Sequence, residues 1–471
     1  MPTENAHQRY LAELPNSWSI CDLRALGSIV GGSTPSRAIS RFWNGNIPWV
    51  TPGEMTALVG TKFLNDTRER ITRAGYESCG TRLLPPGSLL ITTRATLGLV
   101  ALAGCEVSTN QGFKSVVFCR DNYPDFYFHL FHRLKPEMER LASGTTFLEI
   151  SAGDFGRITI PVPPPSEQRA IAAVLDTIDD AIQKTEQIIA KLQQVKQGLL
   201  HDLLTRGIDD NGELRDPERH PEQFQDSPLG RIPKGWEVRN LEQCIDRIID
   251  HRGKTPTKIG GEWSTSDDAI IALSARVVKG GKLIGIERAK KVNRELYDKW
   301  MPIKLMDGDI LMTSEAPAGE FYFIHGKTDY CLSQRLFAIR ADQTKVLPAY
   351  LYHELSGGHA YSEIMGSLSG STVFGIRQDV LRTIQVVIPE MRIQQRLEDA
   401  TIPLLRNIKV LDAQTQELTT LRDWLLPMLM NGQVTVAEGE LTDAAFIRDL
   451  FETGKFDAVI HLAARAGVRP S

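Results

Sequence analysis

At 471 residues the chain is too long for one ordinary domain, and its length indicates about three. Hydrophobic residues make up 42% of it and charged residues 24%, which is typical of a globular protein with apolar cores. The formal net charge of −4 excludes a uniformly basic surface, so any face that binds nucleic acid must be local.

The distribution of cysteines and the hydropathy of the chain indicate the cellular location of the protein. The six cysteines are scattered and form no CxxC pair, which argues against a zinc site and against a disulfide framework. The N-terminal segment is polar, and no run approaches the roughly 20 apolar residues of a membrane helix. We therefore expect a cytoplasmic protein without a metal site and without membrane contact.

The first region, residues 1–165, is predicted to be rich in β-structure. Short apolar runs at 88–92, 115–118 and 158–162 lie between Gly/Pro turns and are expected to form strands. One interior helix is expected over 124–141.

A long helix is predicted next, over 166–206. Three prolines at 163–165 end the preceding strand, and Ser166 is the expected N-cap. Apolar residues then recur in two interleaved series with a period of seven, from Ile171 and from Leu175, over about five heptads. The pattern predicts a coiled coil; an ordinary core helix is the alternative.

After an acidic linker at 207–230, the chain repeats itself. Five segments recur in order, at an offset that drifts from 218 to 226 residues. The matches are 14–18 with 232–236, 31–35 with 251–256, 86–93 with 307–314, 143–146 with 369–372, and 158–163 with 384–389. A repeat this long is no solenoid unit, so it implies two copies of one domain-plus-helix unit related by approximate two-fold symmetry.

The second copy is therefore expected to contain a domain at 231–390 and a second long helix at 391–434. Its interior helix is expected over 348–365. Trp18 and Trp236 lie beside proline in both copies and are assigned to the cores.

The two long helices share one heptad frame. The predicted seam residues are Ile171, Leu175, Ile178, Ile182, Ile189, Leu192 and Leu199 in the first helix and Leu397, Leu404, Ile408, Leu411, Leu418 and Leu425 in the second. Lys196 and Arg422 interrupt the seam at matching positions and would meet in a parallel pair, so an antiparallel pair is favoured. Each helix would span about 57–60 Å.

Four motifs carry a resemblance to a known family. Ile-Pro-Val-Pro-Pro at 160–164 and Glu-Gln-Arg-Ala-Ile at 167–171 open the first long helix, and Leu-Leu-His-Asp-Leu-Leu-Thr-Arg-Gly at 199–207 closes it. With Phe-Trp-Asn-Gly-Asn-Ile-Pro-Trp-Val at 42–50, they resemble the specificity subunits of type I restriction–modification systems, over about residues 14–434. The second copy departs from the pattern: 389–396 is a degenerate match, and nothing there corresponds to the Phe-Trp motif.

The resemblance implies a fold of class α+β. Two α/β target-recognition domains related by a pseudo-two-fold axis would be joined by a long antiparallel two-helix coiled coil. The expected boundaries are 1–165 and 231–390 for the two domains, 166–206 and 391–434 for the spacer helices, 207–230 for the linker and 435–471 for a tail.

The resemblance also implies a function. Each domain would read one half of a bipartite, asymmetric site in double-stranded DNA, and the helix pair would set the gap between the halves. Two methyltransferase subunits would dock on the helices and methylate adenine with S-adenosylmethionine, and motor–nuclease subunits would join for restriction. The chain itself would hold no cofactor and perform no chemistry.

Candidate DNA contacts are polar side chains in the loops that follow matched strands. Base edges are usually read by Arg, Asn or Gln, a Glu could accept from cytosine, and phosphates are held by Lys, Arg or hydroxyl groups. Turn and capping roles are the alternative for each residue. The candidates are Thr93, Arg94, Thr96, Gln111, Lys114, Thr145 and Thr146 in the first copy and Ser314, Glu315, Gln334, Arg335, Ser371 and Thr372 in the second.

The sequence gives little support for an enzymatic function. The sequence contains neither the Asn/Asp-Pro-Pro-aromatic motif of an adenine methyltransferase nor the GxxxxGK[ST] loop of a motor. The tail at 441–471 resembles an internal fragment of nucleotide-sugar epimerases and dehydratases, without their Gly-rich turn and Tyr-xxx-Lys pair. We interpret it as a gene-fusion or reading-frame remnant without epimerase activity. The alternatives are a tail that completes a sugar-nucleotide enzyme binding NAD(H) in another chain, and an inactive or truncated-fusion scaffold that ignores DNA.

Overall fold

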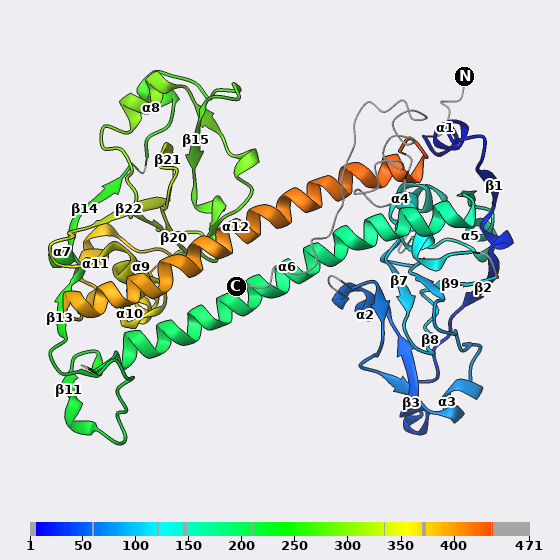
Figure 1. Cartoon of the computed structure of the whole chain (residues 1–471), viewed down its shortest axis with the longest axis horizontal. Coiled ribbons are helices and arrows are strands. Elements are labelled where there is room, and N and C mark those ends of the chain that lie inside the picture. Colours follow the sequence, from blue (N-terminus) through cyan, green and yellow to red (C-terminus); the bar gives the residue numbers. More distant parts are fainter. Residues whose placement is uncertain are drawn as a thin grey trace, which may run out of the picture. The chain divides into compact units, whose positions relative to one another are not determined.

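The computed structural model describes residues 6–58, 61–119, 122–144, 148–209, 211–251, 253–333, 335–369, 374–434 and 436. The chain divides into two compact units. Unit 1 comprises residues 1–187 and 412–471, and unit 2 comprises residues 188–411. Two long helices, α6 (Pro165–Thr205) and α12 (Met391–Met430), contribute one half to each unit (Figure 1).

Unit 1 combines short strands with helices. Its strands are β1 (Ser19–Asp22), β2 (Gly27–Gly31), β3 (Trp43–Val50), β4 (Phe63–Leu64), β5 (Arg70–Ile71), β6 (Leu89–Ile91), β7 (Val100–Ala103), β8 (Ser108–Thr109), β9 (Lys114–Phe118) and β10 (Thr159–Val162). Its helices besides α6 and α12 are α1 (Ala6–Ala12), α2 (Pro52–Ala57), α3 (Arg73–Glu77), α4 (Pro124–Leu141) and α5 (Ala152–Gly156). The strands predicted at 88–92, 115–118 and 158–162 and the helix predicted at 124–141 are confirmed.

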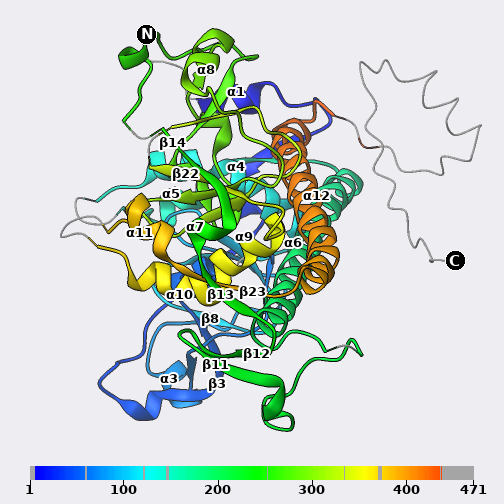
Figure 2. The same cartoon turned by 90° about the vertical axis from the view of Figure 1, so that its left-hand side faces the viewer.

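Unit 2 has the same mixture of elements. Its strands are β11 (Phe224–Ser227), β12 (Gly230–Pro233), β13 (Glu237–Asn240), β14 (Ile245–Asp250), β15 (Ile270–Leu273), β16 (Val278–Lys279), β17 (Lys282–Leu283), β18 (Lys291–Val292), β19 (Ile310–Thr313), β20 (Phe321–Phe323), β21 (Tyr330–Leu332), β22 (Leu336–Ala341) and β23 (Gln385–Ile388). Its helices are α7 (Leu241–Cys244), α8 (Arg294–Trp300), α9 (Pro348–Gly357), α10 (His359–Gly366) and α11 (Gln378–Thr383). Figure 2 shows α7 and α11 beside the pair β13–β23.

The sheets of the two units share one topology. The order β2-β9-β6-β7 of unit 1 recurs as β14-β22-β19-β20 in unit 2, and β5-β3-β8 recurs as β18-β15-β21. Each of these three-stranded sheets has one antiparallel and one parallel pairing. The pair β1–β10 likewise corresponds to β13–β23. The internal repeat found in the sequence is therefore a repeat of the fold.

The long helices pack antiparallel within each unit. In unit 1, Ile171 and Leu175 of the first half of α6 share an apolar core with Leu425 and Leu429 of the last half of α12. In unit 2, the last half of α6 and the first half of α12 share a core with α9. Opposite ends of the helices therefore meet in each unit, as the positions of the two seam cations predicted.

Those two cations lie in different units. Arg422 in unit 1 is paired with Asp179, with 3.3 Å between Nη1 and Oδ1. Lys196 in unit 2 is half-buried, and burial together with the charge of Lys282 lowers the pKa of its ammonium group. The antiparallel arrangement thus avoids a direct meeting of like charges in the seam.

Two expectations about helices are corrected. The first long helix begins at Pro165, so Ser166 lies in its first turn and is not the N-cap. Proline is well suited to the first helical position because its fixed φ is helical and its missing N–H has no partner there. The single helix expected over 348–365 is two helices, α9 and α10, which meet at Gly358.

A buried carboxyl group lies at this break. Glu354 is fully buried, and its Oε1 accepts hydrogen bonds from the backbone N–H groups of Val387 (3.3 Å) and Ala360 (3.4 Å). Its Oε2 has no hydrogen-bond partner. A Cβ at position 358 would lie 2.0 Å from Oε2 and 2.9 Å from the Cα of Glu354, so a larger residue there would displace the buried carboxyl group. Burial raises the pKa of Glu354 to about 7, and the backbone N–H groups oppose this rise.

The buried Glu354 predicts a pH-dependent stability. Because its pKa is higher in the folded chain than its ordinary 4.5, the folded chain binds more protons than the unfolded chain between these values. The contribution of Glu354 to stability is therefore expected to decrease as the pH rises from 4.5 to about 7, by on the order of 3 kcal/mol in total.

Urea unfolding followed by circular dichroism between pH 5 and pH 8 measures this effect. Glu354→Gln is expected to become more stable relative to the wild type as the pH rises from 5 to 8. It removes the contribution of this carboxyl group and leaves that of buried His353, whose pKa is lowered to about 3, in place. Glu237→Gln changes an exposed carboxyl of the same unit and is the control. An equal pH dependence in the wild type and in Glu354→Gln would contradict the prediction.

Each long helix ends at a glycine that packs on a tryptophan. Gly207 and Gly432 have φ values of +61° and +68°, in the left-handed region. A Cβ at 207 would lie 2.5 Å from Cζ2 of Trp236, and a Cβ at 432 would lie 2.2 Å from Cγ of Pro15 and 3.4 Å from Cζ2 of Trp18. Trp18 and Trp236 are 6% and 3% exposed, which confirms their assignment to the cores.

Candidate functional site

Three loops that carry the predicted contact residues converge in unit 1. Loop A (92–98) follows β6, loop B (110–114) leads into β9, and loop C (143–150) follows α4. The Thr93 N–H donates to the Gly112 carbonyl of loop B (2.8 Å), and the Thr93 carbonyl accepts from the Ile150 N–H of loop C (3.1 Å). The Ala95 N–H also donates to the Leu148 carbonyl (3.0 Å). Backbone hydrogen bonds therefore hold the three loops together.

Unit 2 repeats this frame with its own loop A (313–319), loop B (333–337) and loop C (369–376). The Ser314 N–H donates to the Arg335 carbonyl of loop B (2.9 Å), and the Ser314 carbonyl accepts from the Ile376 N–H of loop C (2.9 Å). Within loop C, Ser369 and Gly375 exchange two hydrogen bonds of 3.0 Å. The two units thus present the same three-loop frame.

Loop A has the same turn in both units. The hydroxyl of Thr92 accepts a hydrogen bond from the Leu99 N–H, and that of Thr313 accepts one from the Glu320 N–H, each at 2.9 Å. Ala95 and Ala316 have φ values of 61° and 56°, which non-glycine residues seldom adopt. The side chains at 94 and 315 therefore leave equivalent backbones.

The loops of unit 1 carry a group of three charges. Arg94 pairs with Glu149 of loop C, with 3.5 Å between Nε and Oε2, and its side chain is 45% exposed. Lys114 is 3.8 Å from the same carboxylate, but its side chain is only 13% exposed. Arg94 is therefore the cation of this group that is open to a ligand, and Lys114 mainly positions Glu149.

The loops of unit 2 carry the opposite polarity. Glu315 takes the place of Arg94 on loop A, and its side chain is 40% exposed. Its carboxylate pairs with Arg335 of loop B at 3.5 Å. Arg335 has a φ of 65° and its side chain is 49% exposed. One frame therefore presents a cation on loop A in unit 1 and an anion on loop A in unit 2.

Two of the predicted contact residues are corrected. Thr93 and Ser314 are 0% and 1% exposed, and they lie two residues and one residue after the buried strands β6 and β19, respectively. Their side chains cannot reach a macromolecule from there, and their backbones serve instead to join the three loops. Thr96 and Gln111 are exposed as expected. Five other candidates lie outside the described residues, namely Thr145, Thr146, Gln334, Ser371 and Thr372.

A fourth segment of unit 1, residues 32–37, lies against loop B and was not predicted as part of the site. The Thr34 hydroxyl donates to the Gln111 amide oxygen. The exposed guanidinium of Arg37 lies 3.9 Å from the ring centre of Trp43 and is paired with Glu69. The turn at 31–35 is one of the five repeated segments of the sequence, but only the fold shows that it contacts loop B.

Comparison with known proteins decides the family. A model of the type I restriction modification DNA specificity domain matches residues 15–194 and again residues 233–420. The chain belongs to this family. Specificity subunits of type I systems are non-catalytic, and the chain is a protein of this class.

Relatives and solved structures agree with membership of the type I specificity family. The MjaIX specificity subunit of Methanocaldococcus jannaschii is 26% identical over 440 residues, which cover 91% of this chain and 96% of the relative. The MjaVIII specificity subunit of the same organism is 21% identical and covers 92% and 96%. The crystal structure of a type I S subunit from M. genitalium has the same fold, with a TM-score of 0.57, 14% identity and coverage of 91% of this chain and 98% of that chain.

In this specificity-family chain the predicted seam faces inward. Among the seam residues, Leu175 is fully buried and Leu192 is half-buried, and none of the seam side chains is exposed.

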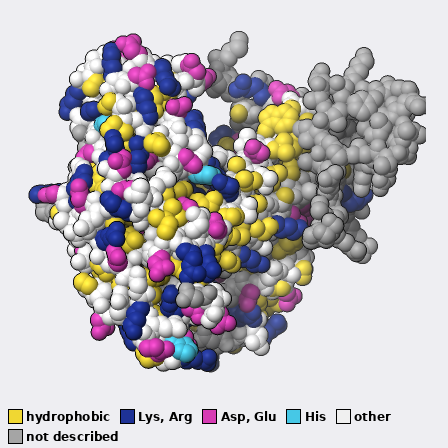
Figure 3. All heavy atoms as spheres, turned by 60° about the vertical axis from the view of Figure 1, so that its left-hand side comes forward, with side chains coloured by type: hydrophobic (Ala, Val, Ile, Leu, Met, Phe, Trp, Pro, Cys, Tyr) yellow, Lys and Arg dark blue, Asp and Glu magenta, His cyan; other side chains and the backbone are white. Residues whose placement is uncertain are grey.

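The charged surface is mixed. On the face drawn in Figure 3, Lys and Arg side chains are interspersed with Asp and Glu. That face therefore offers no continuous basic surface.

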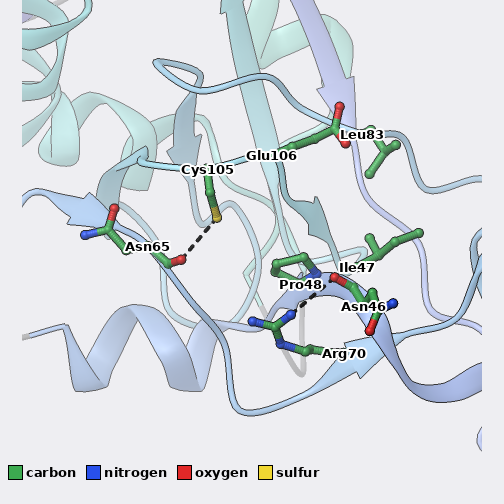
Figure 4. Close-up of a pocket in the computed structure, with 8 residues that line it drawn as sticks. All are labelled: Asn46, Ile47, Pro48, Asn65, Arg70, Leu83, Cys105 and Glu106. Atoms are coloured by element: carbon green, nitrogen blue, oxygen red, sulfur yellow. Dashed lines mark hydrogen bonds between the residues drawn. The ribbon is translucent and has the colours of Figure 1, made fainter.

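A hollow of about 370 Å³ in unit 1 offers no nucleophile (Figure 4). Cys105 at its wall donates to the Asn65 carbonyl (3.1 Å), and Arg70 donates to the Asn46 carbonyl (3.2 Å). Burial, with a smaller effect of Asp66, raises the pKa of the Cys105 thiol, which therefore stays protonated near neutral pH.

Other predictions concern features of the whole chain. Within the part of the chain that the structure describes, no three His, Cys, Asp or Glu residues are grouped as a metal site would require. The described helices include none with the length and apolar character needed to span a membrane. The tail at 441–471, with its epimerase-like fragment, lies outside the described residues.

Proposed function

We propose that this chain is the sequence-specific DNA-binding subunit of a type I restriction–modification complex and that it reads a bipartite, asymmetric site. The observation that carries the proposal is the three-loop frame, which occurs once in each unit and carries different exposed groups. Equivalent frames suit one mode of binding to the DNA groove, and different side chains suit two different half-sites. Catalysis belongs to partner subunits, with S-adenosylmethionine bound by the methyltransferase.

The proposal assigns a task to each part of the chain. The domains at 1–165 and 231–390 each read one half-site, and the spacer helices at 166–206 and 391–434 fix the gap, with 207–230 as the linker. Two methyltransferase subunits and the motor–nuclease subunits are the proposed partners. Since the substrate is cellular DNA, the proposed location is the cytoplasm.

Apolar side chains on the outer faces of the spacer helices support the docking of partners. In unit 2, Ile188 and Val195 of α6 are 48% and 57% exposed, and Val410 of α12 is 55% exposed. In unit 1, Trp424 of α12 is 50% exposed. Ile188 and Val195 are seven residues apart and therefore lie on one face of α6, where a partner would bury them together.

The double variant Val195→Asp, Val410→Asp tests this docking surface. Burial of two new carboxylates in an apolar interface is expected to weaken methyltransferase binding by about 100-fold or more and to abolish co-purification. Gln194→Asp, Asn407→Asp adds the same charge at neighbouring exposed polar positions and is expected to retain binding. Size-exclusion chromatography of the co-expressed subunits shows whether each variant elutes together with the methyltransferase. Equal co-elution of the two double variants would contradict the proposed surface.

The function itself is tested by mapping methylation. The chain is co-expressed with its neighbouring methyltransferase, and N6-methyladenine is mapped across host DNA by single-molecule sequencing. A bipartite methylated motif that is absent without this chain is the expected result. A stable complex that methylates nothing would favour the inactive-scaffold alternative, and the absence of any complex would refute the proposed partnership.

A further inference from the structure

Arg94 and Glu315 occupy equivalent positions in the two three-loop frames. Each follows a buried residue whose N–H and carbonyl are both bonded to neighbouring loops, and each precedes an alanine with positive φ. The backbone on both sides of each position is therefore held in an equivalent way. What differs between the two units at this place is the side chain and its charge.

Both side chains are held by contacts that a ligand can replace. Arg94 is paired with Glu149, and Glu315 is paired with Arg335, in each case at 3.5 Å and with all four side chains 40–49% exposed. Ion pairs this exposed contribute only about 0–1 kcal/mol, because water solvates the separated charges well. Exchange of the intramolecular partner for a base or a phosphate therefore costs little.

We infer that Arg94 and Glu315 are specificity-determining residues that each select one base, Arg94 a guanine in one half-site and Glu315 a cytosine in the other. Guanine presents two acceptors in the major groove, O6 and N7, which match two donors of a guanidinium. Cytosine presents the N4 amino group, which donates to a carboxylate. This inference rests on the proposed function, and it adds which residues select and what they select.

The second residue of each ion pair, Arg335 in unit 2 and Glu149 in unit 1, has a different role when DNA binds. When Glu315 turns to a cytosine, Arg335 is released beside the DNA backbone and can neutralise a phosphate. In unit 1, the release of Arg94 leaves Glu149 next to Lys114, so no carboxylate is left without a cation. The opposite polarity of the two frames is thus compatible with the same negatively charged duplex.

The test exchanges each side chain for glutamine and maps methylation in the co-expressed complex. Glutamine matches the donor and acceptor of adenine, and a good contact of this kind discriminates by about 1–3 kcal/mol. Arg94→Gln is expected to change a guanine to adenine at one position of one half-site, with a 5- to 150-fold change in relative methylation of the two bases. Glu315→Gln is expected to change a cytosine to adenine at one position of the other half-site only.

Matched variants separate base reading from a structural role. Glu149→Gln removes the same ion pair as Arg94→Gln but is expected to leave the motif unchanged. Arg94→Lys keeps donors for guanine and is also expected to keep the motif. Arg24→Gln changes an exposed, ion-paired arginine of unit 1 outside the three loops and is the surface control.

An unchanged motif in Arg94→Gln, or the same change in Glu149→Gln, would overturn the assignment of Arg94. A change in both half-sites with either glutamine variant would show that neither residue selects a single base. These outcomes presuppose a wild-type motif. If the wild-type complex methylates no motif, the proposed function has failed, and the inference is refuted with it.

Discussion

Insertion of one heptad at the centre of each long helix is expected to lengthen the gap between the two half-sites by up to about three base pairs, without changing either half-site. Seven residues add about 10.5 Å of helix at 1.5 Å per residue, and a DNA turn of about 34 Å contains about ten base pairs. The insertions follow Gln187 in α6 and Leu411 in α12, where the two units divide, so the contacts within each unit are retained. A whole heptad also preserves the frame of the seam.

Methylation mapping of the co-expressed complex measures the gap directly. A heptad in α6 alone shifts one helix against the other and is expected to abolish methylation, which makes it the control for the paired insertion. A changed half-site with an unchanged gap would contradict the role of the helices as a ruler. The expected effect is large, because the original motif is lost and a different one replaces it.

Replacement of Gly207 by alanine is expected to destabilise unit 2 by about 2–5 kcal/mol. Alanine at a φ of +61° costs about 1–2 kcal/mol because Cβ is crowded in the left-handed conformation. The added Cβ would also lie 2.5 Å from the buried Trp236 ring, and such overpacking costs about 1–3 kcal/mol more. Thermal and urea unfolding of the purified chain measure the sum.

Gly230→Ala is the control for this experiment. Gly230 has a φ of +93° in the same unit, but a Cβ there meets no atom within 4 Å. It therefore reports conformational strain without the clash, and its loss of stability is expected to be about 1–2 kcal/mol. Equal losses at 207 and 230 would mean that the contact with Trp236 contributes nothing.

The sequence predicted the parts of the fold that depend on periodicity. The heptads predicted both long helices and, through Lys196 and Arg422, their antiparallel packing. The repeat predicted two similar domains. The repeat did not reveal that the Phe-Trp strand β3 corresponds to β15. The two strands occupy the same place in their sheets, but their residues differ, and Trp49 of β3 corresponds to an ordinary apolar position in β15.

The remaining errors have local physical causes. The break between α9 and α10 depends on the buried carboxylate of Glu354 and its contact with Gly358, which a helical pattern does not reveal. In the candidate site, the sequence identified all three loops and their exposed residues Arg94 and Glu315, but it also included Thr93 and Ser314. These two side chains are polar but buried, because backbone hydrogen bonds to the neighbouring loops continue beyond the ends of β6 and β19.

The end of each long helix packs on the first part of a domain in the same way in both units. In unit 2, α6 reaches Trp236 through a continuous linker, whereas in unit 1 α12 reaches Pro15 and Trp18 through space, and the Tyr10 hydroxyl donates to the Met430 carbonyl at 2.6 Å. The two junctions are therefore equivalent in packing, and only one of them is covalent. A circularly permuted chain, joined from the end of α12 to residue 6 and opened within 211–220, contains the same junctions with their linkage exchanged. The order of the two domains along the chain is thus separable from the packing at the junctions between the domains and the long helices.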